Sequence, residues 1–315
     1  MNQQPADHPR PIVIVGPTAS GKSDVAMAWC QRTASSEIVA VDSMQVYRGM
    51  DIGTAKPTPD DRRRVVHHCL DLAEPDETFT VAAFTRAATT AIDAIAARRH
   101  QAVLVAGTGL YLRAITDPME MPGQWPHLRA EMEQRCRERG PQAVYAELAV
   151  LDPIAASRID ACNVRRIVRA MEVIRGSGQL FSSFGDGINI YPPTPYQQFG
   201  IRWPRPQLRA RIATRVERMI EAGLVDEVTT LVATSQLSIT ARQALGYKEI
   251  IEHLEGRVSL DEAIAQITLR TQQFAVRQAR WFGRDPRIRW IDIDGAADHN
   301  PVDHVIAVLE EEAAA

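Results

Sequence analysis

Residues 16–23, with the sequence GPTASGKS, have the types and spacing that bind a phosphate group. They fit the pattern G-x-x-x-x-G-K-[ST], and they lie between the β-branched run Ile12–Val15 and a helical pattern, which is the context that this loop requires. The two glycines allow a tight turn with inward-pointing amides, and the helix that follows adds the positive end of its dipole. Lys22 supplies a positive charge, and the Ser23 hydroxyl is placed to bind a Mg²⁺ shared with the phosphates. A phosphorylated ligand is expected, but the loop alone does not specify the reaction.

Two further polar residues follow predicted strands. Asp42 follows the apolar run Glu37–Val41, and Thr108 follows a second run at 102–106. In open α/β sheets, ligands bind at the carboxyl ends of the strands. Asp42 is therefore either a reactive group beside the phosphate loop or the N-cap of a helix, and Thr108 either contacts a phosphate oxygen or caps the next helix. Lys56, in a segment rich in glycine and proline, is a candidate for a second phosphate contact.

The order of elements predicts the scaffold for these groups. Predicted strands alternate with helices over about 22–33 and 80–98, which is typical of a parallel, doubly wound α/β sheet. This alternation stops near residue 117, and from about 127 to 180 the pattern is helical and rich in charge. A strand at 198–202 resumes the sheet, and the rest is predicted to be helical. We expect an α/β core like that of phosphate-loop NTPases, at 1–115 and 198–315, with a helical insertion domain at 116–197.

Composition limits the function classes. The chain has 315 residues and a net charge of −3, which argues against a nucleic-acid binder that is basic throughout but not against a local basic groove. Its four cysteines are far apart, which disfavours disulfides and a structural zinc site and favours reduced thiols. No signal peptide or membrane-spanning run is evident. The sequence predicts a cytoplasmic protein without a membrane segment. It leaves the oligomeric state open, and we expect a monomer.

One predicted helix carries a concentrated positive charge. Residues 270–289 include six arginines and one acidic residue, Asp285, interleaved with glutamine and aromatic residues. Arg277, Arg280 and Arg284 recur at helical spacing and form a basic stripe on one face. The stripe is either a solvated surface or a site for phosphate contacts and base stacking, which arginine, glutamine and aromatic side chains suit.

Three reactions are compatible with these residues: those of a kinase, a GTPase and a transferase that uses a diphosphate ester. The guanine motif Asn-Lys-x-Asp is absent, which argues against a GTPase. A kinase remains possible because the insertion could act as a lid. In a transferase, Asp42 would take a proton from the incoming nucleophile. Diphosphate would then be the leaving group, stabilised by Lys22, the loop amides and Mg²⁺.

Seven motifs follow one another along the chain. They are GPTASGKS at 16–23, VDSMQVY at 41–47, MDIGTAKP at 50–57, His67-His68, GTGLY at 107–111, ALGYK at 244–248, and Arg277-Gln278 with Trp281-Phe282. In this order they resemble the tRNA dimethylallyltransferase family, whose members prenylate the adenine next to the anticodon. The resemblance covers residues 12 to 292, and the combination is far more specific than the phosphate loop alone.

The resemblance implies roles for specific residues. Asp42 would be the general base toward the exocyclic amine of adenine, with Thr108 and Lys22 beside the reacting groups. The insertion and the C-terminal helices would grip the anticodon stem-loop, from which the target adenine is flipped out. The implied ligands of dimethylallyl diphosphate are Gly16, Pro17, Thr18, Ala19, Ser20, Gly21, Lys22 and Ser23, with either Arg211 or Arg215 as a further contact and Mg²⁺ at Ser23. The implied tRNA contacts are Asp42, Ser43, Met44, Gln45, Thr108, Arg129, Arg165, Arg166, Arg169, Gln243, Gly246, Lys248, Arg277, Gln278 and Arg280.

One position departs from the family pattern. The family often has a basic residue just before Arg-Gln, where this chain has Val276. One phosphate contact is thereby lost, and we expect a difference in tRNA affinity or in its salt dependence. Two alternatives stay open: a relative that prenylates free adenine nucleotides, against which the insertion and the basic helices argue, and a nucleotide or metabolite kinase.

Overall fold

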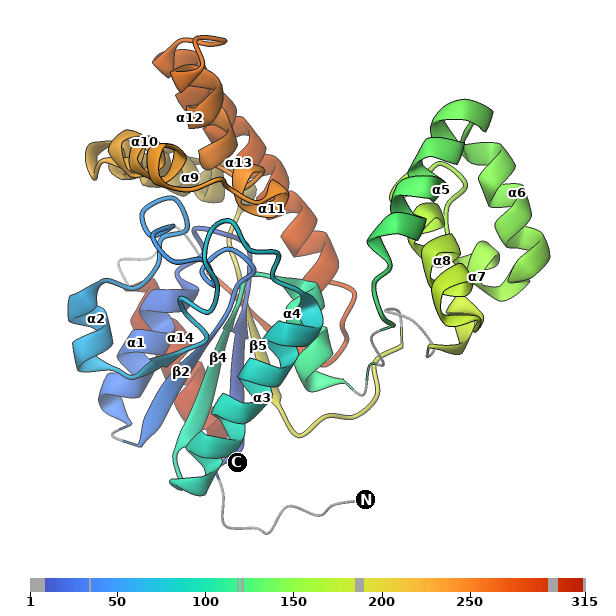
Figure 1. Cartoon of the computed structure of the whole chain (residues 1–315). Helices are drawn as coiled ribbons and strands as arrows, with labels where there is room; N and C mark the ends of the chain where they lie inside the picture. The colour runs from blue at the N-terminus through green and yellow to red at the C-terminus, as the bar shows by residue number, and fades with distance from the viewer. Residues whose placement is uncertain are drawn as a thin grey trace. The chain divides into compact units, whose positions relative to one another are not determined.

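The computed structural model describes residues 9–33, 35–117, 119, 122–184, 190–293 and 300–313. The chain divides into two compact units. The first consists of Met1–Thr116 and Pro193–Ala315, and the second of Asp117–Pro192. Figure 1 shows strands in the first unit, whereas the second is built from helices.

The first unit is organised around a six-stranded sheet with the order β3-β2-β4-β1-β5-β6. All neighbouring strands are parallel. Strand β1 lies between β4 and β5, so the chain builds the sheet first to one side of β1 and later to the other. The loop that leaves the carboxyl end of β1 therefore lies at a topological switch point, where α/β sheets bind ligands. The predicted α/β core is confirmed. Its strands are β1 (Ile12–Val15), β2 (Ser36–Val41), β3 (His67–His68), β4 (Gln101–Ala106), β5 (Gln197–Arg202) and β6 (Ile288–Asp292).

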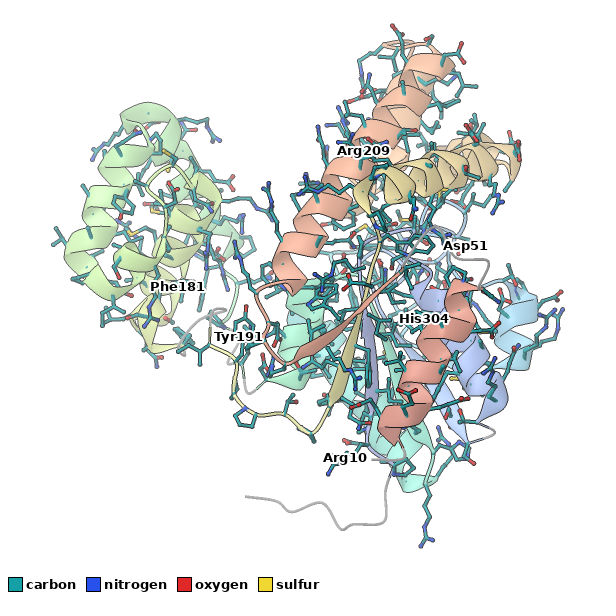
Figure 2. The ribbon with its side chains drawn as sticks, turned by 180° about the vertical axis from the view of Figure 1, so that it is seen from behind. Arg10, Asp51, Phe181, Tyr191, Arg209 and His304 are labelled. Carbon is teal, nitrogen blue, oxygen red and sulfur yellow. The ribbon has the colours of Figure 1, made fainter. Side chains whose placement is uncertain are left out.

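Both faces of the sheet are covered, which explains why the central strands read as continuous apolar runs. Because successive side chains in a strand point to opposite faces, Val13 and Val15 belong to the core cluster that includes α3 (Val81–Ala97). Ile12 and Ile14 belong to the other cluster, with α1 (Lys22–Arg32) and α14 (Pro301–Ala313). In the view from behind, α14 carries His304 and packs on α1 (Figure 2).

A group of helices follows β5 and covers the edge where the phosphate loop lies. The long helix α13 packs against α9, α12 and α4. Figure 1 shows α9, α10, α12 and α13 grouped beyond the carboxyl ends of the strands. Their bounds, with those of the remaining short helices, are α2 (Pro59–Arg64), α4 (Gly109–Thr116), α9 (Arg205–Glu221), α10 (Leu224–Thr234), α11 (Ile239–Arg242), α12 (Tyr247–Leu254) and α13 (Leu260–Phe282).

The prediction that the chain is helical after residue 202 was wrong for one segment. Strand β6 pairs with β5 from Ile288 opposite Gln198 to Asp292 opposite Arg202. It is an edge strand in which Ile288 and Ile291 are buried while the residue after each is exposed. The strand is only five residues long, and it follows an arginine-rich helix that ends at Phe282. So few alternating residues cannot be distinguished from the helical pattern before them.

The second unit is a small helical bundle with its own core. It contains α5 (Pro126–Arg139), α6 (Pro141–Leu151), α7 (Pro153–Arg158), α8 (Val164–Ser177) and the 3₁₀ turn Phe181–Ser183. Three of the helices begin with proline, whose fixed φ suits the first helical position. The core includes Met132, Leu148, Ile167 and Met171. The helical pattern predicted over 127–180 is confirmed.

The second unit is inserted at one point of the first. The chain leaves the first unit after Thr116 and rejoins it at Pro193. The Thr194 hydroxyl donates a hydrogen bond to the carbonyl of Thr116 at 3.1 Å. The two chain segments at the insertion point are therefore held side by side.

Two further observations concern the whole chain. Within the ranges that the structure describes, no helix has both the length and the apolar character needed to cross a membrane. The thiols of Cys30, Cys69 and Cys136 are buried and that of Cys162 is exposed, and all four are free.

Candidate active site

The phosphate loop connects β1 to α1 in a conformation that requires its two glycines. A Cβ atom on Gly16 would lie 2.8 Å from Ser20 Oγ, closer than real side chains approach, and 3.0 Å from the carbonyl of Ile201. Gly21 caps α1 with a φ of 91°, a left-handed conformation that glycine adopts without strain. The predicted position of the loop at the carboxyl end of β1 is confirmed.

Two cations and a carboxylate share one electrostatic environment beside this loop. Lys22 Nζ donates to the carbonyl of Pro17 at 2.8 Å. Burial lowers the pKa of Lys22 to about 7; the charge of Arg215 lowers it further and that of Asp42 opposes the shift. Burial also lowers the pKa of Arg215, against the opposing charges of Asp42 and Asp24. Lys22, Arg215 and Asp42, which the resemblance assigns to diphosphate and catalysis, are thus brought together.

Two side chains, one on α9 and one in the segment before it, hold backbone carbonyls of the phosphate loop. Arg211 Nε donates to the carbonyl of Ala19 at 2.8 Å, and its guanidinium lies 4.3 Å from the ring centroid of Trp203. Trp203 Nε1 donates to the carbonyl of Ser20 at 2.9 Å. A cavity of about 200 Å³ adjoins the loop here, lined in part by Ser20, Trp203 and Arg211. Sequence reasoning missed Trp203, because nothing local marks a tryptophan after a strand as a loop contact.

Asp42 uses its two carboxylate oxygens differently. Its Oδ1 accepts hydrogen bonds from the amides of Met44 at 2.8 Å and Gln45 at 3.4 Å. The described chain forms no helix there, so Asp42 caps a turn, and its interpretation as a helix N-cap was wrong. A Cβ atom on Gly107 would lie 3.1 Å from Oδ2. Glycine at 107 therefore allows the loop after β4 to approach the second carboxylate oxygen.

Thr108 ties the loops after β2 and β4 together. Its Oγ1 accepts from the amide of Ser43 at 3.1 Å and lies 3.3 Å from Ser43 Oγ, to which it donates. The next residue, Gly109, begins α4, and a Cβ atom there would lie 2.0 Å from two atoms of the Trp281 ring. The motif GTGLY thus lets α13 lie directly against the start of α4.

Gln278 joins the phosphate loop to the loop after β4. Its residue is 6% exposed, and its Oε1 accepts from the amide of Thr18 at 2.8 Å. Its Nε2 donates to the carbonyl of Gly107 at 2.8 Å. The Thr18 amide, assigned to diphosphate, is therefore directed at a side chain. Gln278, assigned to tRNA, has both ends of its amide engaged inside the protein.

The arginines of the C-terminal segment divide into two groups. Arg270, Arg287 and Arg289 form ion pairs with Glu249, Asp285 and Glu312, respectively. By contrast, Arg277, Arg280 and Arg284 are exposed on and just after α13, and within the described ranges none of these three forms an ion pair. We call these three residues the arginine stripe. It presents three uncompensated positive charges to solvent, and Val276 lies beside it with 37% exposure.

The arginines of the second unit also differ from one another. Glu172 is buried; it accepts from the amide of Trp125 at 2.9 Å and forms an ion pair with Arg169 at 2.8 Å. Arg169 also donates to the carbonyl of Pro122, and Arg129 lies 3.7 Å from Glu172. These two arginines anchor the segment before α5 on α8. Two others assigned to tRNA, Arg165 and Arg166, are exposed on α8.

Lys56 has an internal role. Its side chain is buried, and Nζ donates to the carbonyl of Tyr47 at 2.7 Å, to Asp51 at 2.5 Å and to Asp71 at 2.8 Å. An ammonium group has three donors, so all of them are used. The prediction of a second phosphate contact at Lys56 was wrong. Gln45 supports the same segment, because its Nε2 donates to the carbonyls of Thr54 at 3.1 Å and Ala55 at 3.2 Å.

The motif ALGYK packs on the motif DIGTAKP. Glu227 accepts from the amides of 51, 52 and 53 at 2.7 to 3.3 Å, and from the Tyr247 hydroxyl at 2.6 Å. A Cβ atom on Gly53 would lie 2.4 Å from the Tyr247 ring. Of the tRNA contacts predicted nearby, Gln243 is exposed, Gly246 is buried, and Lys248 Nζ lies 3.9 Å from Glu252. Those contacts stay predictions.

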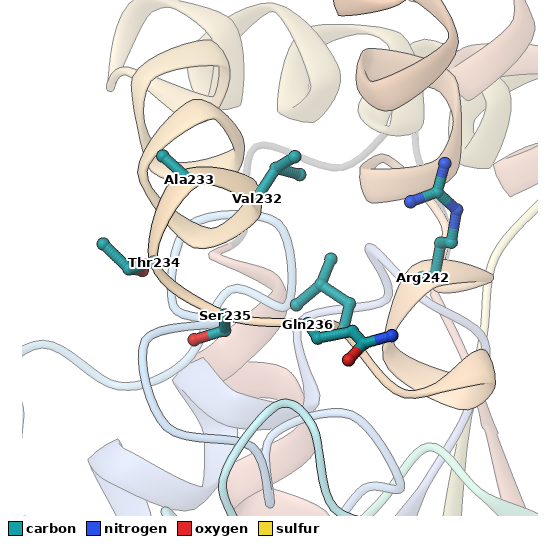
Figure 3. A pocket seen from close by; sticks show the side chains of 7 residues that line it. Val232, Ala233, Thr234, Ser235, Gln236 and Arg242 are labelled. Carbon is teal, nitrogen blue, oxygen red and sulfur yellow. The ribbon is translucent and has the colours of Figure 1, made fainter.

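A larger hollow lies elsewhere on the first unit, between the end of α10 and α11. Its volume is about 590 Å³, and it is lined by residues 232–237 and Arg242. Figure 3 shows Arg242 across the hollow from Val232. Arg242 is paired with Glu255 at 2.5 Å, and the hollow shares no residue with the phosphate-loop site.

Known proteins resemble this chain along most of its length. The family model described as "IPP transferase" matches residues 45–285, and the one described as "Isopentenyl transferase" matches residues 10–75. The chain is 46% identical over 304 residues to the tRNA dimethylallyltransferase of Streptomyces coelicolor, covering 96% of each chain. It is 47% identical over 289 residues to the tRNA dimethylallyltransferase of Thermobifida fusca, covering 90% of each.

Solved structures show the same likeness. The full-length tRNA isopentenylpyrophosphate transferase of Bacillus halodurans matches with a TM-score of 0.70 at 34% identity, covering 97% of each chain. A eukaryotic dimethylallyltransferase acting on tRNA matches in fold with a TM-score of 0.78 at 23% identity, covering 96% of this chain and 79% of the other. With a family model that matches most of the chain and relatives above 40% identity along nearly all of it, this protein belongs to the IPP transferase family.

Proposed function

We propose that this protein transfers a dimethylallyl group from dimethylallyl diphosphate to the exocyclic amine of the adenine 3′ to the anticodon in tRNA, releasing diphosphate. The observation that carries the proposal is the convergence of Lys22, Arg215 and Asp42 at the carboxyl edge of the sheet. Two cations suit a diphosphate leaving group, and one carboxylate suits a nucleophile that must lose a proton. The names of the relatives support the same reaction.

Diphosphate binding rests on the loop and its cations. The amides at the N-terminal end of α1 would donate to the diphosphate oxygens. Lys22, which contacts the Pro17 carbonyl, and the half-buried Arg215, whose charge acts on Lys22, would stabilise the negative charge that develops as the bond to the leaving oxygen breaks. Arg211 contributes indirectly, because it holds the Ala19 carbonyl and so fixes the shape of the loop.

The loop also fits a Mg²⁺ ion bound jointly with the substrate. Ser23 lies in the first turn of α1 with its side chain exposed, and its hydroxyl is the hard oxygen ligand that Mg²⁺ prefers. Within the described ranges, no group of three or more His, Cys, Asp or Glu side chains could hold a metal ion. Ser23 and the diphosphate oxygens would therefore share the ion. When bound, Mg²⁺ would neutralise part of the diphosphate charge.

Asp42 is the proposed general base. As the new bond forms between the adenine nitrogen and the first carbon of the dimethylallyl group, the carbon–oxygen bond to diphosphate breaks, and Asp42 takes the proton that the nitrogen loses. Two backbone amides hold Oδ1, so the carboxylate has a fixed direction. Thr108, held by Ser43, lies beside it and would orient the amine.

The exposed arginines are the proposed tRNA contacts. The arginine stripe would neutralise backbone phosphates, and its interleaved aromatic Phe274, which lies 5.7 Å from the Arg277 guanidinium, supports stacking. On the second unit, Arg165 and Arg166 are exposed and suited to the anticodon stem-loop. Free thiols at all four cysteines fit a reducing cytoplasm, where we expect the enzyme to act.

A single assay separates this function from its alternatives. Pure protein and Mg²⁺ are incubated with radiolabelled dimethylallyl diphosphate and either bulk tRNA or AMP. The proposal expects label in tRNA and none in AMP, with digestion locating the label on the adenine beside the anticodon. Label in AMP alone would identify an enzyme acting on free nucleotides. Consumption of ATP without prenyl transfer would indicate a kinase.

A further inference from the structure

The hydrogen bonds of Gln278 point to a role that contact with RNA does not explain. Its residue is 6% exposed, and its amide spans from the Thr18 amide to the Gly107 carbonyl with two bonds of 2.8 Å. Thr18 belongs to the loop that would hold the leaving group. Gly107 belongs to the loop that lies against the Asp42 carboxylate, since a Cβ there would be 3.1 Å from Asp42 Oδ2 and 3.6 Å from Gln278 Nε2.

The amide of glutamine has the two functions that this bridge requires. One end must accept from an N–H group and the other must donate to a carbonyl, and glutamine has both functions at its tip. A glutamate of the same shape would accept at Thr18 but would face the Gly107 carbonyl with an unprotonated oxygen. The bridge also belongs to the helix that carries the arginine stripe, because Arg277 precedes Gln278 directly and is exposed.

We propose that Gln278 is a positioning residue that sets the distance between the phosphate loop and the Asp42 carboxylate. It acts on transfer through Asp42 and does not contact the tRNA itself. Prenyl transfer requires two atoms to approach within a narrow range of distances. One is the substrate carbon, which is anchored through its diphosphate, and the other is the nitrogen of the amine that faces Asp42. A misplacement of about 1 Å costs about 100-fold in rate in comparable cases. The inference rests on the proposed function.

The test compares Gln278→Met with the wild type and with Gln236→Met, an exposed substitution on the loop after α10. We expect Gln278→Met to lower the single-turnover transfer rate at saturating substrates by about 10- to 100-fold. Its dissociation constants for tRNA and for inorganic diphosphate should stay within about threefold of the wild type, and Gln236→Met should match the wild type in all three. A tRNA dissociation constant raised tenfold or more, at an unchanged saturating rate, would show a direct tRNA contact and overturn the proposal.

A double variant isolates the path through Asp42. If Gln278 acts by positioning that carboxylate, adding Gln278→Met to Asp42→Asn should lower the residual rate by less than about threefold. A full multiplicative loss would overturn the proposal. If Gln278→Met does not fold, Gln278→Asn, which is shorter by one methylene and can reach only one partner, replaces it with the same expectations. A wild-type protein that transfers no label to tRNA refutes the proposed function instead, so the two failures are distinguishable.

Discussion

Replacing Gly109 with alanine should push α13 away from the phosphate loop. The added Cβ would lie 2.0 Å from both Cδ1 and Nε1 of Trp281 and 2.8 Å from Cε2. Favourable contacts between heavy atoms lie at about 3.5–4.0 Å, so the ring must retreat by about 1.5–2 Å. Trp281 lies on the same helix as Gln278, three residues further on. A shift of that size would stretch both 2.8 Å bonds of Gln278 beyond the hydrogen-bonding range.

The expected cost has a thermodynamic part and a kinetic part. Overpacking of this kind destabilises proteins by about 1–3 kcal/mol, which urea unfolding followed by circular dichroism would measure as a lower midpoint with an unchanged slope. The single-turnover transfer rate at saturating tRNA and dimethylallyl diphosphate should fall about tenfold or more, because the two sides of the site lose their fixed spacing.

A compensating variant provides the control. In Gly109→Ala combined with Trp281→Leu, the flat ring is gone and the methyl group has room. The double variant should therefore be no less stable and no slower than Trp281→Leu alone. The reasoning fails if Gly109→Ala alone has a free energy of unfolding within about 0.5 kcal/mol of the wild type and transfers at the wild-type rate. Trp281 would then not pack against the start of α4.

Four further predictions concern other residues of the first unit. Asp42→Asn should lower the single-turnover rate by about 10²–10⁴-fold with diphosphate affinity unchanged, and normal turnover would exclude Asp42 as the base. Because the pKa of Lys22 is lowered to about 7 from 10.5, its charge is present below pH 7 and lost above it. Calorimetry should show that the affinity of the wild type for inorganic diphosphate falls above about pH 7, by up to about tenfold per pH unit. The control is Lys22→Arg, whose guanidinium stays charged and whose affinity should not fall in this way. Parallel pH profiles for the two proteins would contradict the prediction. Arg277→Gln and Arg280→Gln should each lower the salt slope of tRNA binding by about one without changing the saturating rate, and unchanged slopes would make them solvated surface residues. Glu227→Gln should destabilise the fold by about 1–3 kcal/mol in urea, since its oxygens accept from three amides and a hydroxyl; wild-type stability would show that these bonds contribute little.

The sequence allows the sheet and the phosphate loop to be predicted because both are local patterns. Apolar runs buried on two faces, a glycine-rich turn and a carboxylate after the next strand all lie within short windows. Asp42 could be placed at the reactive edge for this reason, because parallel strands end together. Strand β6 could not be predicted, because its five residues show too few alternations to stand out beside an arginine-rich helix.

Long-range polar contacts were the part that local patterns could not supply. Thr18 and Gln278 are separated by 260 residues, and no periodicity reports a hydrogen bond between them. Lys56 shows the same limit from another side. A lysine beside glycines reads equally as a ligand for an anion and as a partner for buried carboxylates, and only the positions of Asp51 and Asp71 decide between them. Arg169 and Glu172 repeat that ambiguity on a helix.

The hydrogen bond between Thr194 and Thr116 bears on how a chain with an inserted domain evolves. Because this bond joins the segment before the second unit to the segment after it, the helical bundle is an insertion whose two attachment points lie next to each other. Gain, loss or exchange of the bundle would change only the connection between Thr116 and Pro193 and would leave the strand order of the sheet as it is. Phosphate chemistry and the added helical surface could therefore have had separate histories before they were joined in one reading frame.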